Sequence, residues 1–308
     1  MVWRVGILVA LALAAAGCVD GASSAPAPVV HTEPSAEALA RLRDTDICAL
    51  IPSAILAEHG VTAVGTDELY GCTAALDDGT GQAGHADWGV RALGDTALDS
   101  GETVTIDGVV VTLLGDRHVL SPEEIATFPQ RSCTAYAPLP TGGSIEVDLT
   151  LGPDTEPCTA VQPMVGAALS EWKRHPQSGE SPGTVRTEVT GADPCDVLTH
   201  LPDARRTETQ WVDRCWFDLD GDHLYVAYSH ATAREFQNYE AVEIAGRQVF
   251  RTSEDGPPSY IVRVGPTFDP VADGYDFDDV PAVRIHGKDQ EAVEKTVTAV
   301  LDVFPDAG

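Results

Sequence analysis

The feature that most constrains the fold of this chain is an internal repeat, because segments of its first half recur roughly 140–147 residues later. The corresponding segments are 46–52 and 193–199, 72–77 and 215–220, and 104–111 and 242–249. Each half also ends in a stretch with apolar residues at helical spacing, 158–173 and 288–304. We therefore expect two tandem domains, 37–174 and 185–308, joined by a Pro- and Gly-containing linker at 175–184.

The cysteines give a covalent framework to the same two halves. After Cys18, the chain has six cysteines that fall into three consecutive pairs, Cys48 and Cys72, Cys133 and Cys158, and Cys195 and Cys215. Six thiols allow fifteen connectivities, but consecutive pairing closes short loops, each worth roughly 3 kcal/mol by the chain-entropy model. There is no CxxC, and no histidine stands at zinc-ligand spacing from a cysteine pair. The sequence therefore predicts three disulfides, with neither a metal site nor a cofactor.

The N-terminus has the layout of an export signal. Arg4 precedes an apolar run over 5–16, which is too short to cross a membrane as a helix. Small residues then lead into a cysteine, and Ala15, Ala16, Gly17 and Cys18 resemble the lipobox of bacterial lipoproteins, with Ala15 where leucine is usual. This resemblance implies that 1–17 is a signal peptide and that Cys18 carries a diacylglycerol. Residues 18–36 would be a flexible tether, and the protein would lie on the extracytoplasmic face of the cell membrane.

The order of predicted elements within each half is a helix, several strands and a closing helix. Asp46 and Asp193 are positioned to cap the first helix of each half, and Gly60 to end it in the first. The pair Asp107-Gly108 between apolar runs predicts a hairpin, and Ala245-Gly246 is its weaker counterpart. Strands are predicted at 71–77, 88–93, 133–137, 145–151, 214–219, 223–228, 260–264 and 282–286. The fold class is therefore α+β, with each antiparallel sheet packed on one face by an N-terminal and a C-terminal helix.

In each half a helix begins around a cysteine, Cys48 or Cys195, and a strand with Cys-Thr or Cys-Trp follows. This pattern is similar to that of small actinobacterial envelope lipoproteins, which are grouped as a domain of unknown function. It is also similar to extracellular sensor-like domains of mycobacterial envelope proteins. The resemblance covers both halves and implies an α+β fold, disulfides and surface display. It supplies no catalytic residues.

The charge of the chain limits its partners. With 19 basic and 48 acidic residues the net charge is −29, which repels nucleic acid and anionic lipid headgroups. A lipid anchor is then the expected means of membrane attachment. Cations, basic proteins and neutral glycans remain open as partners, and the acidity is also explained by solubility alone.

Two acidic loops could hold calcium. Asp218, Asp220 and Asp222 occupy the first carboxylate positions of an EF-hand loop, but His223 and Ser229 stand where glycine and glutamate are required, so a hairpin turn is the better interpretation. A second loop contains Asp273, Asp276, Asp278 and Asp279, although solvated acidic loops are far commoner than calcium sites. His223 and His230 are expected on opposite faces of one strand and therefore cannot share a metal.

The aromatic residues gather in the second half, at Trp211, Trp216, Phe217, Tyr225 and Tyr228. Trp216 and Phe217 should point to opposite faces of one strand, so at most one of them is core. Core packing accounts for most of this cluster, and Trp211 and Trp216 are the candidates for a partner surface.

We expect a non-catalytic extracytoplasmic lipoprotein that binds a partner or ligand at the cell envelope. A wall-associated enzyme with an unrecognised site and a structural spacer are the alternatives. A deep pocket lined by titratable groups would favour the enzyme, and a shallow apolar patch near Trp211 and Trp216 would favour protein binding. The absence of both would favour the spacer.

Overall fold

The structure is a computed structural model that describes residues 34–77, 83–91, 101–140, 142–252, 256–270 and 278–306, with only the backbone described at residues 83 and 208–210. The predicted signal peptide, Cys18 and residues 18–33 of the predicted tether lie outside the described residues, as do Asp273 and Asp276. None of the described helices is both long enough and apolar enough to cross a membrane.

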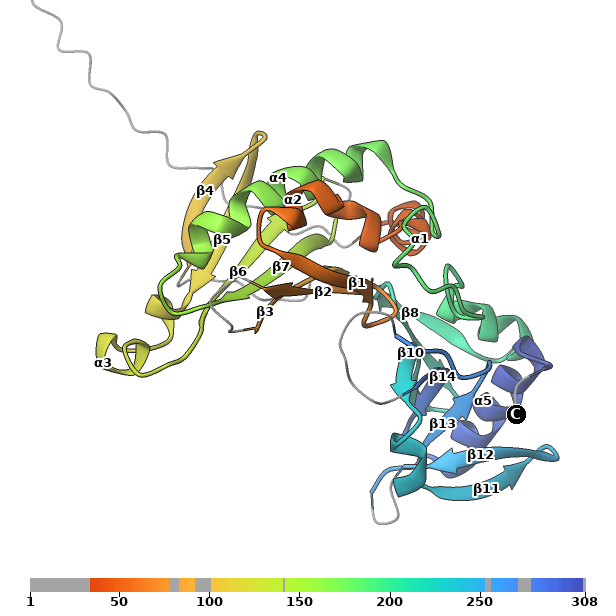
Figure 1. Ribbon diagram of the computed structural model, residues 1–308. Coiled ribbons are helices and arrows are strands. Elements are labelled where there is room, and N and C mark those ends of the chain that lie inside the picture. Colours follow the sequence, from red (N-terminus) through yellow and green to blue (C-terminus); the bar gives the residue numbers. More distant parts are fainter. Residues whose placement is uncertain are drawn as a thin grey trace, which may run out of the picture. The chain divides into compact units, whose positions relative to one another are not determined.

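The fold is α+β, with two seven-stranded antiparallel sheets (Figure 1). The strands of the first sheet are β1 (Val61–Thr66), β2 (Gly71–Asp77), β3 (Ala83–Arg91), β4 (Glu102–Ile106), β5 (Val109–Gly115), β6 (Arg131–Pro138) and β7 (Ser144–Leu151). Its helical segments are α1 (Ala36–Asp44), η1 (Cys48–Leu50), α2 (Ser53–Ala57), η2 (Asp116–His118), α3 (Pro122–Ile125) and α4 (Pro157–Arg174).

The second half supplies the other sheet, drawn from cyan to blue in Figure 1. Its strands are β8 (Arg205–Gln210), β9 (Arg214–Leu219), β10 (Asp222–Thr232), β11 (Glu240–Ile244), β12 (Arg247–Arg251), β13 (Ser259–Arg263) and β14 (Asp279–His286). Its helical segments are η3 (Pro194–His200), η4 (Glu235–Asn238) and α5 (Gln290–Val303).

The two sheets have the same topology, which confirms the internal repeat. The first sheet has the strand order β1-β2-β3-β7-β6-β5-β4, and the second has the order β8-β9-β10-β14-β13-β12-β11. Each strand of one sheet therefore has a counterpart at the same place in the other. The pairing registers relative to Cys72 and Cys215 then match individual residues, so that Thr73 corresponds to Trp216 and Gly89 to Ala227.

The predicted hairpins form at residues that tolerate a left-handed backbone. Asp107 and Gly108 have φ angles of 50° and 82° between β4 and β5, and Ala245 and Gly246 have 51° and 76° between β11 and β12. Positive φ at both central residues is what a two-residue hairpin turn requires, and glycine supplies it without steric cost. Asp220-Gly221 makes the same turn between β9 and β10, which confirms the hairpin interpretation of the Asp218–Asp222 loop.

The three disulfides that consecutive pairing predicts are present. Cys48–Cys72 joins η1 to β2, and Cys195–Cys215 joins η3 to β9, so the two bonds are counterparts in the repeat. Cys133–Cys158 joins β6 to α4 and belongs to the first half only. The equivalent segments η1 and η3 are therefore each joined by a disulfide to the second strand of their half.

The first helix of the second half differs from the prediction, because it is a 3-10 helix over Pro194–His200 rather than an α-helix. In the first half the same region is divided into η1 and α2. The predicted caps are nevertheless used: Asp46 accepts a hydrogen bond from Ala49 N, and Asp193 accepts one from Cys195 N. Such a side-chain acceptor satisfies an amide that has no partner within the helix.

The main cores combine strand residues with residues of the closing helices. In the first half, Val161, Met164 and Val165 of α4 are buried in one cluster with residues of β2, β3, β6 and β7. In the second half, Val293, Val297 and Val300 of α5 share a cluster with Phe217 and Tyr228. Phe217 is fully buried whereas its neighbour Trp216 is half-buried, so the predicted alternation along this strand is correct.

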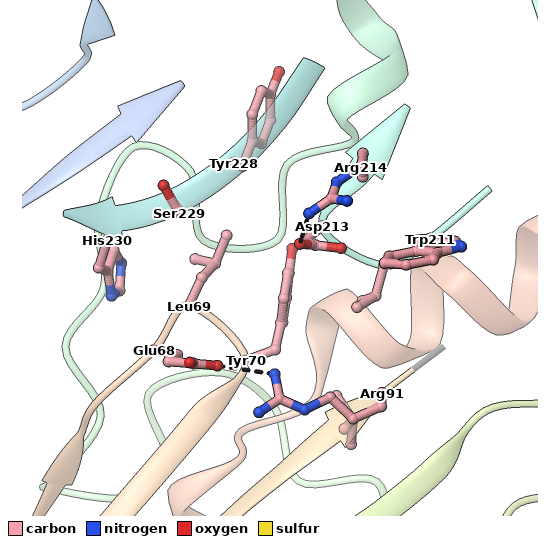
Figure 2. Close-up of a pocket in the computed structure, with 12 residues that line it drawn as sticks. Glu68, Leu69, Tyr70, Arg91, Trp211, Asp213, Arg214, Tyr228, Ser229 and His230 are labelled. Carbon is pink, nitrogen blue, oxygen red and sulfur yellow. Dashed lines mark hydrogen bonds and ion pairs between the residues drawn. The ribbon is translucent and has the colours of Figure 1, made fainter. Parts of the chain in front are cut away.

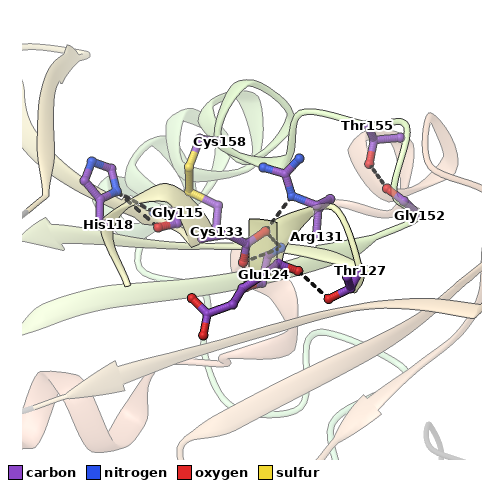
Figure 3. A network of polar contacts seen from close by, with 11 residues as sticks. Gly115, His118, Glu124, Thr127, Arg131, Cys133, Gly152, Thr155 and Cys158 are labelled. Carbon is purple, nitrogen blue, oxygen red and sulfur yellow. Dashed lines mark hydrogen bonds and ion pairs between the residues drawn. A yellow bond between two sulfur atoms is a disulfide. The ribbon is translucent and has the colours of Figure 1, made fainter. Parts of the chain in front are cut away.

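One polar network fixes the segment before β6. The carboxylate of Asp116 accepts hydrogen bonds from Arg131 Nε at 2.7 Å, from Ser132 N and from Ser132 Oγ at 2.6 Å. Figure 3 shows Arg131 in this region together with the Cys133–Cys158 disulfide. Burial alone would raise the pKa of Asp116, but the hydrogen bonds from Ser132 and Arg131 outweigh it and hold the pKa below its ordinary value.

Candidate functional site

A cavity of about 380 Å³ is lined by residues of both halves (Figure 2). The described residues of both sheets belong to one compact unit of the chain. The lining consists of Glu68, Leu69, Tyr70, Val90, Arg91, Trp211, Val212, Asp213, Arg214, Tyr228, Ser229 and His230. This volume falls within the range that small-molecule sites occupy.

The cavity is built from equivalent segments of the two repeats. Residues 68–70 come directly before β2, and residues 211–213 stand at the same positions before β9. The backbone repeats one hydrogen bond in both copies: Val90 N donates to Tyr70 O at 3.2 Å, and Tyr228 N donates to Asp213 O at 2.8 Å. The same local structure therefore presents different side chains from each half, which makes the lining asymmetric.

Arg43 links the two halves beside this cavity. Its guanidinium forms an ion pair with Asp193 at 3.0 Å, and its Nε donates to Val212 O at 3.0 Å. The side chain is only 4% exposed, so the charge has little access to water and depends on these partners. Arg43 therefore contacts both Val212, which lines the cavity, and Asp193, which caps η3.

The predicted linker is attached to the first half by Asp46. The fully buried carboxylate of Asp46 accepts hydrogen bonds from Gly179 N at 2.9 Å, Ser181 N at 2.8 Å and Thr184 Oγ1 at 2.5 Å. Its other contact is the cap of Ala49 N. Composition alone predicts a linker here, and the structure adds that buried side chains of the first half hold its backbone, since the Thr66 hydroxyl also donates to Gly183 O.

The charges in the cavity lining balance one another. Arg91 forms an ion pair with Glu68 at 2.8 Å, drawn as a dashed line in Figure 2. Arg214 Nη2 lies 3.7 Å from Asp213 Oδ2. The Arg214 guanidinium also lies 4.9 Å from the centre of the Trp211 ring. Two arginines therefore face two carboxylates, which leaves no net charge from these four side chains.

Four polar atoms of the lining are buried and have no hydrogen-bond partner among the described residues. They are Tyr70 Oη, Arg214 Nε, Ser229 Oγ and His230 Nδ1. A buried polar group without a partner costs roughly 1–3 kcal/mol, and such groups are rare in folded proteins. Half of the eight such atoms among the described residues therefore belong to residues that line this one cavity.

The cavity also disfavours charge on its titratable groups. Burial lowers the pKa of His230 to about 4, so this imidazole is neutral at neutral pH. Burial raises the pKa of Asp213, although the nearby Arg214 charge opposes the change. Burial likewise raises the pKa of Tyr70 and that of Tyr228. His230, Tyr70 and Tyr228 are therefore neutral hydrogen-bonding groups at neutral pH, and they lie in the same lining as the two charged pairs.

The lining lacks the geometry of an activated nucleophile. Ser229 and His230 are consecutive on β10, so their side chains point to opposite faces of the strand. His230 Nε2 contacts Thr187 Oγ1 at 3.3 Å. A nucleophilic hydroxyl requires a base within hydrogen-bond reach, and Ser229 Oγ has no such contact with a described residue.

A G-x-S-x-G spacing occurs at 179–183, in the linker, and sequence reasoning missed it. A nucleophile elbow needs a strand before this motif and a helix directly after it, but here the segment follows α4. Ser181 donates its N–H to Asp46, and its Oγ accepts a hydrogen bond from Gly183 N at 3.2 Å. The serine therefore has a structural role in the linker.

The two residues predicted to form a partner surface have different places. Trp211 lines the cavity, whereas Trp216 lies outside its lining, where it stacks with His223 and packs at a tilt against Tyr225. Arg214 connects them, because its guanidinium lies 4.9 Å from the ring centres of both Trp211 and Tyr225.

The carboxylates of the calcium-like loop have separate partners. Asp218 contacts His223, Asp220 pairs with Lys295, and Asp222 accepts from the backbone of Lys288 and Asp289. Among the described residues, no three His, Cys, Asp or Glu side chains are grouped to hold a metal ion. Asp278 and Asp279 of the second acidic loop are described, but the rest of that loop is not.

Sequence reasoning did not identify Tyr70, Arg91, Asp213 and Arg214 as site residues. A signal was available in the repeat itself, since Tyr70-Gly71 and Asp213-Arg214 occupy the same positions before Cys72 and Cys215. A half-buried arginine in place of glycine marks a position where the two copies differ in chemistry. Its importance became visible only when the fold placed both segments around one cavity.

Comparisons with protein-family models, with curated proteins and with solved structures found no match for this chain.

Proposed function

We propose that the protein is a lipid-anchored extracytoplasmic binding protein, and that the cavity lined by Tyr70, Trp211 and Arg214 receives its ligand. The observation that carries this proposal is that four residues lining one cavity each have a buried polar atom without a hydrogen-bond partner among the described residues. Ligand pockets typically combine apolar walls with a few polar groups that fix the orientation of the ligand. Leu69, Val90 and Val212 supply such walls here.

Several considerations support the location and the domain organisation. Three disulfides are typical of an oxidising compartment outside the cytoplasm. The lipobox-like sequence ending at Cys18 would provide the anchor, with residues 1–17 removed and residues 18–36 as the tether. In this proposal, domains 37–174 and 185–308 each carry helices on one face of the sheet and are joined by 175–184.

The titratable residues of the cavity lining are the one observation that supports an alternative function, a wall-associated enzyme. Asp213 and His230 have shifted pKa values of the kind found at catalytic sites. Binding remains the better interpretation because Ser229 has no adjacent base and Glu68 is paired with Arg91. Hydrolysis of an envelope polymer that Asp213→Asn abolishes without weakening binding would support the enzyme instead.

Binding at the cavity can be tested through its tryptophan. The oxidised protein, produced without residues 1–18 and with nitrogen-15 in its tryptophan indoles, would be titrated with the low-molecular-mass fraction of solubilised cell envelope. We expect the Trp211 indole signal to shift, whereas those of Trp88 and Trp172, which are buried in the core of the first half, should stay in place. Ser229→Ala, which removes one of the unpartnered groups, should weaken the response. A titration that moves none of the indole signals would contradict the proposed binding role.

A further inference from the structure

The outer row of aromatic rings on the second sheet is continuous from strand to strand. Trp216 of β9 packs on Tyr225 of β10 with 4.7 Å between ring centres, and Tyr225 packs on His286 of β14 at 5.4 Å. His223, which lies two residues before Tyr225 on β10, also stacks with Trp216, with 5.2 Å between ring centres. Trp216, Tyr225 and His286 are half-buried, and His223 is exposed, so these rings keep part of their surface accessible.

The fold does not require these rings, because the first sheet does without them. In the second sheet, Tyr225 lies directly opposite both Trp216 and His286. The same three positions in the first sheet hold Thr73, Asp87 and Asp148, with Asp87 opposite the other two. The same topology therefore forms with small or acidic side chains at these positions, and the aromatic row is a separate property of the second sheet.

The row leads into the cavity described above. The guanidinium of Arg214 lies 4.9 Å from the ring centre of Tyr225 and equally far from that of Trp211. Arg214 and Trp211 both line the cavity. A ligand that fills the cavity and extends from it would therefore meet Arg214 first and then Tyr225 and Trp216.

The basic side chains beside the row already contact carboxylates. Arg284 forms an ion pair with Glu235 at 2.5 Å, and His223 contacts Asp218 at 2.8 Å. Arg214 lies near Asp213. An anionic ligand would have to displace these carboxylates and would also meet the repulsion of a chain with a net charge of −29. Charge complementarity therefore favours an uncharged ligand.

We propose that the aromatic row and the cavity together bind a neutral carbohydrate chain, with its terminal sugar in the cavity and the following sugars on Tyr225 and Trp216. This inference rests on the proposed binding function and names its ligand class. The flat C–H face of a pyranose ring packs well on an aromatic ring. Sugar hydroxyls both donate and accept hydrogen bonds, which suits a cavity lining that contains donors and acceptors.

The test is calorimetric titration of the oxidised protein with uncharged tetrasaccharides of glucose, mannose, arabinose and N-acetylglucosamine, and with their monosaccharides. We expect at least one tetrasaccharide to bind, more tightly than its monosaccharide and with little change between low and high salt. Trp216→Thr introduces the residue that the first sheet has at this position and should weaken binding roughly tenfold, as loss of an aromatic anchor does. Phe128→Ala, at an exposed ring in the first half, is the matched control and should leave binding unchanged.

The outcomes separate this inference from the proposed function. If no tetrasaccharide binds while the envelope fraction still shifts the Trp211 indole, the carbohydrate assignment is wrong and the binding function stands. Binding of an acidic glycan or a protein that disappears at high salt would also overturn the assignment. If Trp216→Thr unfolds cooperatively like the wild type but binds the tetrasaccharide equally well, the aromatic row is not part of the site.

Discussion

The guanidinium of Arg43 and the carboxylate of Asp193 form an ion pair of 3.0 Å across 150 residues of sequence, and it connects the two repeats beside the cavity. Asp193 is the repeat counterpart of Asp46, and each accepts a backbone hydrogen bond at the start of the equivalent 3-10 segments, η3 and η1. Each aspartate also contacts a residue far away in the sequence: Asp46 accepts a hydrogen bond from Gly179 N of the linker, and Asp193 pairs with Arg43 of the first half. The same capping position thus serves two long-range contacts.

Replacing Arg43 should weaken the connection between the halves. Arg43→Ala leaves Asp193 without its cation and Val212 O without its donor, and we expect a loss of about 2 kcal/mol in unfolding free energy. Arg117→Ala is the control, since this arginine is 54% exposed in its ion pair with Glu102 and exposed pairs contribute little. Urea unfolding of both variants checks the prediction. Equal stability of the two would mean that Arg43 is not a structural link.

Replacing Asp46 should release the linker. Asp46→Ala removes the acceptor of four hydrogen bonds, and hydrogen bonds to a charged group contribute roughly 1.5–3 kcal/mol each. We expect faster hydrogen exchange at Gly179 N and Ser181 N and a clear loss of stability. Thr184→Val, which removes only one donor, should have a smaller effect. Unchanged protection of both amides in Asp46→Ala would contradict the assignment.

Removal of the Cys133–Cys158 disulfide should destabilise the protein by roughly 3 kcal/mol, because the bond closes a loop of 25 residues. Replacing both cysteines by alanine leaves no free thiol, and thermal unfolding reports the change. Since this staple has no counterpart in the second half, the double variant should keep the Cys195–Cys215 bond, as peptide mapping can verify. An unchanged unfolding midpoint would show that the second staple of the first half is dispensable.

Two aspartates with opposite pKa shifts should respond in opposite directions to removal of their charge. The pKa of Asp116 is lowered, so its ionised form stabilises the fold above its ordinary pKa, and that stability is lost as pH falls through the lowered value. Asp116→Asn should therefore cost about 1.5 kcal/mol at pH 7 and little at pH values where the wild-type carboxyl is protonated.

Asp148 lies directly opposite Asp87, and its pKa is raised by burial and by the Asp87 charge, although Thr134 donates a hydrogen bond to it. Its ionisation therefore costs stability at pH values above the raised pKa, and the cost vanishes when the carboxyl is protonated. Asp148→Asn should stabilise the protein by about 0.5 kcal/mol at pH 7. Unfolding curves for both variants between pH 3 and pH 7 (a range set by ordinary carboxyl pKa values near 4) check the two signs. Destabilisation by Asp148→Asn at pH 7 would show that its hydrogen bond outweighs the repulsion.

The repeat, the disulfide pairing, most strands and both closing helices could be predicted because they depend on local signals. Alternation predicted that Phe217 and Trp216 point to opposite faces of the strand, and Phe217 is the buried one of the two. The Asp107-Gly108 turn followed from residues that tolerate positive φ. The 3-10 helix at Pro194–His200 was not predicted, because both helix types share the same start signals. The cavity was also missed, since it depends on long-range contacts between segments such as 68–70 and 211–214 that show no local pattern.

The proposed role outside the cytoplasm depends on export, oxidation and a lipid on Cys18. Intact mass measurement of the protein from its native membrane, with and without reduction and alkylation, tests these together. The account predicts loss of residues 1–17, an added diacylglycerol at Cys18 and six thiols that alkylate only after reduction. A mass that retains residues 1–17 without lipid, or thiols that alkylate without reduction, would contradict it.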